Sequence, residues 1–206
     1  MIVVIILHAT YVLDFFYNEN WYTRTIDITH DHMGFMLAWG DTTFLPTLYT
    51  LQAQFLAFHP VHLTRFQATF CCALGLFGYW IFRSSNHQRD DFRAKHGQLN
   101  IWGAPATYMK CTYKTSDGKQ HQSLLLTSGW WGLSRHSNYL GDMLLSFAMC
   151  AACGFSSLLP WSYFAFMFTF LQHRMTRDER RCLAKYGDQW KEYRKVVPYR
   201  LVPYLY

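Results

Sequence analysis

The residues best suited to proton chemistry in the first half of the chain lie at the start of an uncharged run. Asp41 begins this run, and Tyr49 and Gln52 follow on nearly the same face of a predicted helix. A carboxylate, a phenol and an amide could form a polar notch in an apolar pocket. A phenol can deliver a proton when hydrogen bonds stabilise its anion. The plainer alternative is an aspartate that caps a helix and a tyrosine at a membrane interface.

A second set of candidates lies on one stripe of a predicted helix near the C-terminal end. Arg174, Asp178 and Cys182 stand at positions i, i+4 and i+8, and Tyr186 is next in line. Such a stripe could face a ligand, or it could be a solvated face stabilised by i,i+4 pairs. Because the stripe follows directly on an apolar span, we favour an inward-facing arrangement.

Two ionisable residues interrupt an otherwise apolar region. Arg135 and Asp142 lie within the stretch 134–142. Charges at membrane depth are energetically costly and usually face a cavity or a partner. The same segment could instead be a turn at the membrane surface, where an arginine is tolerated.

Three other patterns are weaker. His30 and His32 lie at i and i+2, on different faces of a helix, so no metal site is predicted there. Cys150 and Cys153 stand among Ala, Met and Phe and are interpreted as small apolar helix residues. The G-x-G-x-x-G signature is absent, so a dinucleotide site in this chain would not be of the Rossmann type.

The composition indicates one domain or one helical membrane bundle of 206 residues. Hydrophobic residues make up 51% and charged residues only 16%, against roughly 25% charged in soluble domains. Of the 19 Lys and Arg, 16 lie within 83–122 and 173–200. No nucleic-acid partner is expected.

Apolar runs supply the candidate membrane spans, and an apolar opening without a basic segment leads us to expect an incomplete chain. The last run is long enough for two crossings, with a break near Gly154 and Pro160. Asp117-Gly118 predicts a small hairpin in the polar region. The runs are 1–17, 42–58, 66–82 and 124–172.

The charge distribution predicts an orientation. The polar connection 83–123 and the charged segment 173–206 flank a region with room for two spans, so both lie on one face of the membrane. The positive-inside rule makes this face cytosolic. The predicted fold is an all-α, multi-pass transmembrane helical bundle with a cytosolic C-terminal cofactor pocket.

From about Tyr11 to the C-terminus, the chain resembles the sterol reductase family. The motifs that carry this resemblance are Leu126-Thr127-Ser128-Gly129-Trp130-Trp131-Gly132, Arg135-His136-Ser137-Asn138-Tyr139-Leu140-Gly141-Asp142, His173-Arg174, Arg177-Asp178-Glu179, Lys185-Tyr186-Gly187, Trp190 with Tyr193, and Val197-Pro198-Tyr199-Arg200. The family's members are about twice as long, so residues 1–206 correspond to its C-terminal, membrane-embedded catalytic half. Four further segments look most like the branch that reduces the sterol ring B C7–C8 double bond: Asp14-Phe15-Phe16, Thr25-Ile26-Asp27, His30-Asp31-His32 and Asn86-His87-Gln88.

The resemblance implies a multi-pass protein of the endoplasmic reticulum whose C-terminal helices enclose NADPH beside a sterol pocket open to lipid. Its partners would be a sterol drawn from the bilayer, the lipid membrane itself and other enzymes of sterol biosynthesis. By similarity, Arg89 and Arg93 would meet the cofactor phosphates. The other residues expected around the cofactor are Leu126, Trp131, Asn138, Tyr139, Asp178, Cys182, Leu183, Ala184, Lys185, Tyr186 and Tyr193.

The reaction that the resemblance implies is reduction of the C7–C8 double bond of 7-dehydrocholesterol-type sterols, the final step of cholesterol biosynthesis. One carbon is protonated and NADPH supplies hydride to the other, in a pocket that excludes water. Asp41 and Tyr49 are the candidates for the proton supply. Alternatives are a Δ14-sterol reductase or lamin B receptor-like sterol-binding protein, and an isoprenylcysteine-type methyltransferase.

Overall fold

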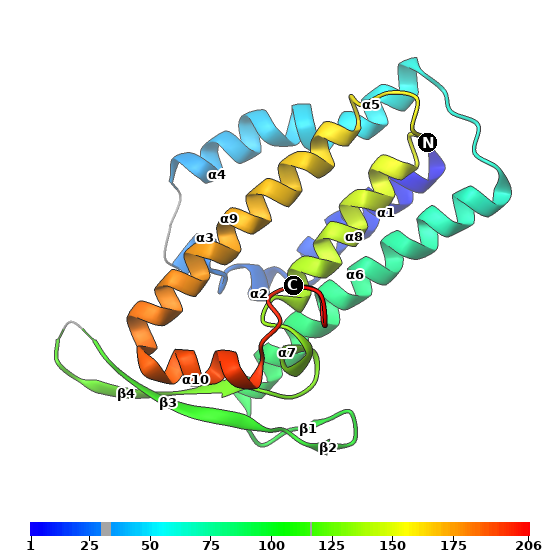
Figure 1. Ribbon diagram of the computed structural model, residues 1–206. Helices are drawn as coiled ribbons and strands as arrows, with labels where there is room; N and C mark the ends of the chain where they lie inside the picture. Colours follow the sequence, from blue (N-terminus) through cyan, green and yellow to red (C-terminus); the bar gives the residue numbers. More distant parts are fainter. Residues whose placement is uncertain (30–33, 116) are drawn as a thin grey trace. The chain divides into compact units, whose positions relative to one another are not determined.

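A computed structural model describes residues 1–29, 34–115 and 117–206 of the chain, which is mostly helical (Figure 1). The chain forms two compact units. The first comprises Met1–Tyr79 and Met143–Met167, and the second comprises Trp80–Asp142 and Phe168–Tyr206. Helices α6 (Arg65–Ala94) and α9 (Trp161–Tyr186) run from one unit into the other.

All regular elements in the described part of the first unit are helices. Its core brings together the buried faces of α1 (Ile2–Tyr17), α5 (Leu51–Phe58), the first half of α6, most of α8 (Ser137–Ala151) and the start of α9. Gly75 of α6 permits the closest of these contacts, because a Cβ there would stand 2.6 Å from both methyl groups of Leu7. Its other described helices are α2 (Glu19–Tyr22), α3 (Ile26–Thr29), α4 (Phe35–Trp39) and η1 (Gly40–Tyr49).

The segment η1 is a π-helix and contains Pro46. Proline lacks the N–H that a helix interior requires, which disfavours a regular α-helix at this point. Threonine hydroxyls bond to the carbonyls four residues earlier, as Thr42 does to Ala38 at 2.6 Å and Thr50 to Pro46 at 3.1 Å. Such side-chain bonds distort helices, so the predicted apolar run 42–58 divides into η1 and α5.

The second unit combines helices with two small antiparallel sheets. The second half of α6 leads into β1 (Asn100–Ile101) and β2 (Ala104–Pro105), and a longer hairpin follows from β3 (Tyr108–Lys114) and β4 (Gln120–Leu126). Next come α7 (Trp130–Leu133), the start of α8, the second half of α9 and α10 (Asp188–Val196). Helix α10 lies along the β3–β4 hairpin (Figure 1), where Trp190 and Tyr193 pack against Met109 and Leu125.

The predicted hairpin is confirmed. Strands β3 and β4 pair from Tyr108↔Leu126 to Lys114↔Gln120, and Asp117-Gly118 lies in the connecting turn. Gly118 has φ +79°, a conformation that favours glycine. The two small sheets make the chain mostly helical rather than purely so, and the first residues of the predicted connection 83–123 belong to α6.

The break predicted near Gly154 and Pro160 is also present, because α8 ends at Ala151 and α9 begins at Trp161. Gly154 has φ +76°. Within the ranges given above, none of the helices has both the length and the apolar character needed to cross a membrane. The multi-pass transmembrane arrangement stays a prediction.

Candidate functional site

A basic pocket of about 350 Å³ lies in the second unit, a size within the range of small-molecule sites. Arg93 comes from the last turn of α6, His96 from the loop after it, and Lys185 from the last turn of α9. Cationic side chains beside hydroxyl and amide groups are suited to phosphate oxygens. The remaining lining residues are Gln122, Ser123, Leu124 and Tyr186.

The pocket unites three residues that the sequence placed around a cofactor: Arg93, Lys185 and Tyr186. The Lys185 ammonium lies 3.8 Å from the centre of the Tyr113 ring and 5.2 Å from that of Tyr186. Tyr186 Oη donates to Ser123 Oγ at 3.1 Å. The aromatic rings hold the lysine over β3 and β4, so its charge is available to an anion in the pocket.

Three further predicted residues gather around the buried side chain of Asn86. The Arg89 guanidinium lies 4.3 Å above the Trp131 ring and donates to Asn86 Oδ1 at 3.4 Å. Asn138 donates to the same oxygen at 3.3 Å. Trp131 is buried and its indole N–H donates to the Ser85 carbonyl at 2.8 Å. The Arg89 guanidinium thus covers one face of the Trp131 ring.

The surroundings of Arg89 lower the pKa of its guanidinium. Burial, and then the neighbouring positive charge of Arg93, lower the pKa of Arg89 to about 10. The guanidinium therefore stays protonated at neutral pH, where an approaching anion would relieve the repulsion between the two arginines. Asn138 Oδ1 is buried without a hydrogen-bond partner among the described residues, and thus offers an unused acceptor beside them.

The stripe on α9 is half-buried, as its spacing predicts. Arg174, Asp178, Cys182 and Tyr186 are each intermediate in exposure, whereas Leu183, Ala184 and Lys185 are exposed. Arg174 Nε donates to Tyr139 Oη at 3.0 Å, which joins the stripe to the start of α8. Burial, followed by the negative charge of Asp178, raises the pKa of Cys182 to about 12. This thiol is protonated at neutral pH and is not a nucleophile.

Tyr193 of α10 and Leu126 of β4 are joined directly. The phenol of Tyr193 is buried and donates to the Leu126 carbonyl at 3.0 Å. Burial raises the pKa of Tyr193 above its usual value. This phenol therefore keeps its proton and fixes α10 to the end of the hairpin.

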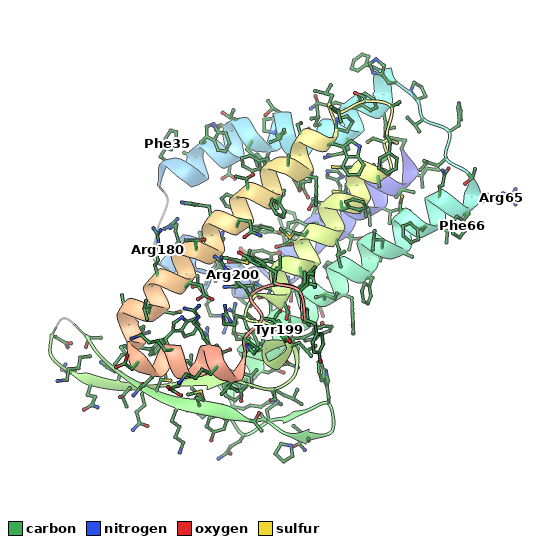
Figure 2. The ribbon with its side chains drawn as sticks, in the orientation of Figure 1. Phe35, Arg65, Phe66, Arg180, Tyr199 and Arg200 are labelled. Atoms are coloured by element: carbon green, nitrogen blue, oxygen red, sulfur yellow. The ribbon has the colours of Figure 1, made fainter. Side chains whose placement is uncertain are left out.

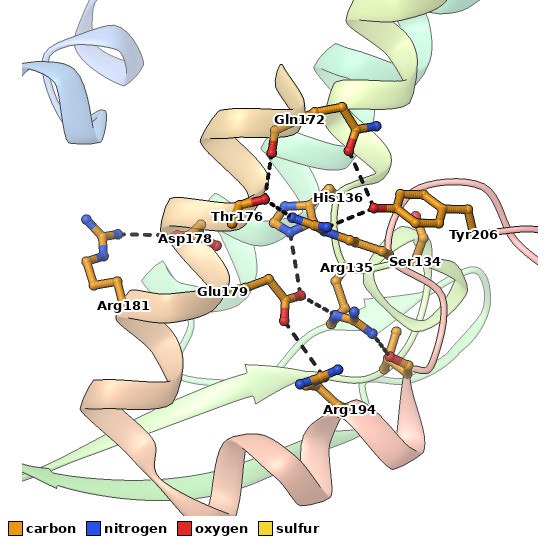
Figure 3. A network of polar contacts seen from close by, with 12 residues as sticks. Ser134, Arg135, His136, Gln172, Thr176, Asp178, Glu179, Arg181, Arg194 and Tyr206 are labelled. Atoms are coloured by element: carbon orange, nitrogen blue, oxygen red, sulfur yellow. Dashed lines mark hydrogen bonds and ion pairs between the residues drawn. The ribbon is translucent and has the colours of Figure 1, made fainter. Parts of the chain in front are cut away.

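A buried ion-pair network connects the segments that carry these residues (Figure 3). Arg135 Nε donates to Glu179 Oε1 at 2.6 Å, and Arg135 Nη1 donates to the carbonyls of Val197 and Pro198 at 2.6 and 2.8 Å. His136 Nε2 lies 3.8 Å from the same Glu179 oxygen. The network thus ties the segment before α8 to α9 and to the chain after α10.

The electrostatics of this network favour a charged Glu179. Burial alone would raise the pKa of this carboxyl, but the hydrogen bond and positive charge of Arg135, with the His136 ring close by, lower it to about 2. Arg194 lies 3.8 Å from the other carboxylate oxygen. These charges therefore hold in place the turn of α9 that also carries Asp178.

Sequence reasoning gave no role to Gln88 or Asn86. Gln88 Oε1 accepts the backbone N–H of Trp130 at 2.9 Å, so this side chain positions α7. Asn86 Oδ1 accepts hydrogen bonds from the side chains of both Arg89 and Asn138. Both residues are amides in the polar second half of a helix whose first half is apolar. This pattern is the feature of the sequence that could have indicated a role for them.

The two candidates for proton supply lie in the first unit, at opposite ends of η1. Asp41 is exposed in its first turn. Tyr49 is half-buried among aromatic rings, with His8 at 4.9 Å and Tyr163 at 5.8 Å between ring centres. His8 bonds through Nε2 to the Tyr49 carbonyl at 3.0 Å. The role of Asp41 and Tyr49 in proton supply stays a prediction.

The histidines that were considered as metal ligands in the sequence lie in a different segment. His30, Asp31 and His32 lie outside the described residues. Among residues 1–29, 34–115 and 117–206, no group of three or more His, Cys, Asp or Glu is placed to hold an ion.

Comparison with known proteins agrees with the resemblance noted in the sequence. The model of the ergosterol biosynthesis ERG4/ERG24 family matches residues 1–206. All 206 residues align with the 7-dehydrocholesterol reductases of Xenopus laevis, at 52% identity over 44% of that protein, and of Danio rerio, at 50% identity over 43%. The Δ14-sterol reductase of Methylotuvimicrobium alcaliphilum is 43% identical over the whole chain and 46% of its own length. The chain thus spans less than half the length of these relatives, and it belongs to the ERG4/ERG24 family of sterol reductases.

Proposed function

We propose that the protein reduces the C7–C8 double bond of a 7-dehydrocholesterol-type sterol with NADPH as the reductant. The observation that carries the choice of substrate is the identity of 52% and 50% to two proteins named 7-dehydrocholesterol reductase, against 43% and 42% to two named Δ14-sterol reductase. The alternative is reduction of the Δ14 bond, supported by those two relatives.

The donor set of the second unit fits a phosphorylated dinucleotide. Arg93 and Lys185 would hold phosphate groups in the basic pocket, with Arg89 as a further cation beside Arg93. Asn138 Oδ1 offers an unused acceptor. When bound, the cofactor would supply hydride. The protein's own residues bind it by charge, and Arg135 and Glu179 hold the segments that carry them in place.

Reduction adds a proton and a hydride across the C7–C8 bond, so a proton donor is required. We assign this role to the Tyr49 phenol, with Asp41 as the carboxylate that completes the proton supply. The rings around Tyr49 give it an apolar setting, in which water is excluded from a cationic sterol.

The proposal includes a lipid membrane, that of the endoplasmic reticulum, as the source of the sterol and the site of neighbouring sterol-biosynthesis enzymes. Large apolar side chains lie exposed along α1, including Ile2 at 75%, Leu13 at 68% and Phe16 at 70%. Water would penalise such surfaces, and lipid would cover them. By the charge rule, segments 83–123 and 173–206 face the cytosol.

The decisive experiment expresses the full-length protein in microsomes that lack sterol reductases and supplies 7-dehydrocholesterol and a Δ14 sterol in parallel. Mass spectrometry should show a gain of two hydrogens in the first substrate with NADPH and much less with NADH. Reduction of the Δ14 sterol alone would replace the proposal by its alternative. Sterol binding without reduction of either substrate would refute a catalytic role.

A further inference from the structure

Three tryptophans form a row in the second unit. The Trp130 ring stands edge-on to Trp80 at 5.3 Å and edge-on to Trp102 at 5.5 Å. Trp80 comes from α6, Trp102 from the β1–β2 turn and Trp130 from α7. Trp80 is 52% and Trp102 is 63% exposed, so the two outer rings of the row present large apolar surfaces.

The backbone at Trp102 shows that the exposed ring is not incidental. Ile101 pairs with Ala104, so Trp102 and Gly103 are the two central residues of a tight hairpin, with φ values of +51° and +86°. Turns of this kind favour Asn-Gly, and a bulky residue at positive φ is strained. A tryptophan held there at a backbone cost, without being buried, indicates a role for the ring outside the protein core.

Contacts with α6 and β1 hold the row of tryptophans in place. Gln88 of α6 accepts the N–H of Trp130 at 2.9 Å, and the preceding Gly129 has φ +63°. A Cβ on Gly129 would stand 2.4 Å from Gln88 and 2.6 Å from Ile101. The segment before α7 is therefore pressed against both α6 and β1, which keeps the three rings in register.

The exposed face of α6 changes from apolar to polar at the row of tryptophans. Upstream of it, one face carries Phe66, Phe70 and Phe77, which are 80%, 56% and 51% exposed, and Phe66 projects from the first turn (Figure 2). Trp80 continues this face by one turn. The next positions on it are polar, ending with His87 and Asp91, whose Nε2 and Oδ2 atoms lie 3.3 Å apart.

We propose that Trp80, Trp102 and Trp130 form an interfacial anchor that seats the β1–β2 turn in the headgroup layer of a phospholipid bilayer. Tryptophan favours this layer because its ring is apolar and its N–H is polar. The apolar face of α6 would meet the acyl chains on one side of the row, and the polar face would meet water on the other. The inference rests on the membrane association in the proposed function, but not on the reaction or its cofactor.

The test uses the full chain, labelled with 5-fluorotryptophan and placed in phosphatidylcholine nanodiscs. Fluorine NMR separates the eight tryptophans, and Trp80→Phe and Trp102→Phe assign the two outer signals. Relaxation is measured with a nitroxide at the 5-position of a lipid chain and, separately, with a water-soluble gadolinium chelate. Trp190, which is 5% exposed and packed under the β3–β4 hairpin, is the internal control.

We expect the lipid nitroxide to broaden the Trp80 and Trp102 signals several-fold more than the Trp190 signal, and more than the soluble chelate does. A Trp102 signal that is broadened by the soluble chelate and unaffected by the lipid nitroxide would overturn the anchor, even if other parts of the protein lie in the membrane. If the chain fails to co-purify with nanodiscs at all, the proposed membrane association falls and the anchor falls with it. Reductase turnover, measured on the same sample, reports the proposed reaction independently.

Discussion

The Arg135 guanidinium occupies the meeting point of three chain segments and donates to Glu179, 44 positions away, at 2.6 Å. The two side chains are 5% and 15% exposed. Arg135 also donates to the Val197 and Pro198 carbonyls, which fixes the chain just beyond α10. The pair therefore holds Asn138 and Tyr139 on one side and Asp178 on the other in a fixed relation.

Replacing Arg135 by Ala should destabilise the protein strongly. The substitution leaves Glu179 and two carbonyl groups without their donor, and loss of one partner of a buried pair costs about 3–5 kcal/mol. Arg181→Ala is the matched control, because Arg181 is 46% exposed and lies 3.4 Å from Asp178. It should cost about 0–1 kcal/mol. Equal losses in the free energy of unfolding, measured in detergent, would contradict the structural role of Arg135.

Glu179 predicts a specific dependence of stability on pH. Its pKa is lowered from 4.5 to about 2 in the folded chain, so its contribution is complete above pH 4.5 and is lost as pH falls toward 2. In Glu179→Gln this loss should be absent, and the stabilities of variant and wild type should converge on acidification. Denaturation profiles between pH 3 and 7 test this. Parallel curves would show that Glu179 titrates normally.

The basic pocket predicts a preference for NADPH. Arg93→Ala should weaken NADPH binding by about 1.5–3 kcal/mol, the range for a hydrogen bond to a charged group, with a smaller effect on NADH. Lys185→Ala should act in the same direction. Lys191→Ala removes an exposed lysine that pairs with Asp188 and lies outside this pocket. Binding measured by calorimetry should leave this control near wild type, and a wild type that binds NADH and NADPH equally would refute the preference.

Tyr49→Phe tests the proton supply. The change removes the hydroxyl and keeps the ring that packs against His8 and Tyr163. Loss of a general acid should lower kcat by about 10²–10⁴-fold while leaving NADPH binding intact. Asp41→Asn should lower kcat in the same assay if its carboxylate takes part. Full turnover in Tyr49→Phe would assign the donor to another group.

Two glycines with similar backbones should respond differently to alanine. Gly129 and Gly187 have φ values of +63° and +58° with ψ values of −142° and −126°, a region that side chains rarely adopt, so each substitution carries about 1–3 kcal/mol of backbone strain. At Gly187 nothing lies within 4 Å of the new Cβ, whereas at Gly129 it would meet Gln88 and Ile101. Gly129→Ala should therefore cost clearly more in thermal stability. Equal losses would show that the segment before α7 yields easily.

Local patterns predicted those features that depend on neighbours along the chain. The i,i+4 spacing of Arg174, Asp178 and Cys182 predicted a shared face, and all three are half-buried on α9. Asp117-Gly118 predicted the hairpin because a glycine can adopt the required positive φ.

Contacts between distant segments could not be predicted in this way. Nothing in the spacing of Arg135 and Glu179 indicates that they meet, since 44 intervening residues leave the geometry open. The π-helix was also unforeseen, because periodicity is judged against the α-helical repeat, and η1 departs from it around Pro46. The family resemblance, rather than residue chemistry, brought Arg89 and Asn138 into the predicted site.

The β3–β4 sheet has only these two strands, so each of them has an outer edge at which a further strand could pair. The backbone N–H of Thr112 in β3 donates to Gln189 Oε1 of α10 at 2.8 Å, and the amide of Gln189 returns a bond to the Thr112 hydroxyl at 3.3 Å. A side chain thus occupies a position where the strand of another molecule could add to the sheet. Gln189 therefore takes up a backbone donor of β3, which makes this N–H unavailable for pairing with a strand of another molecule.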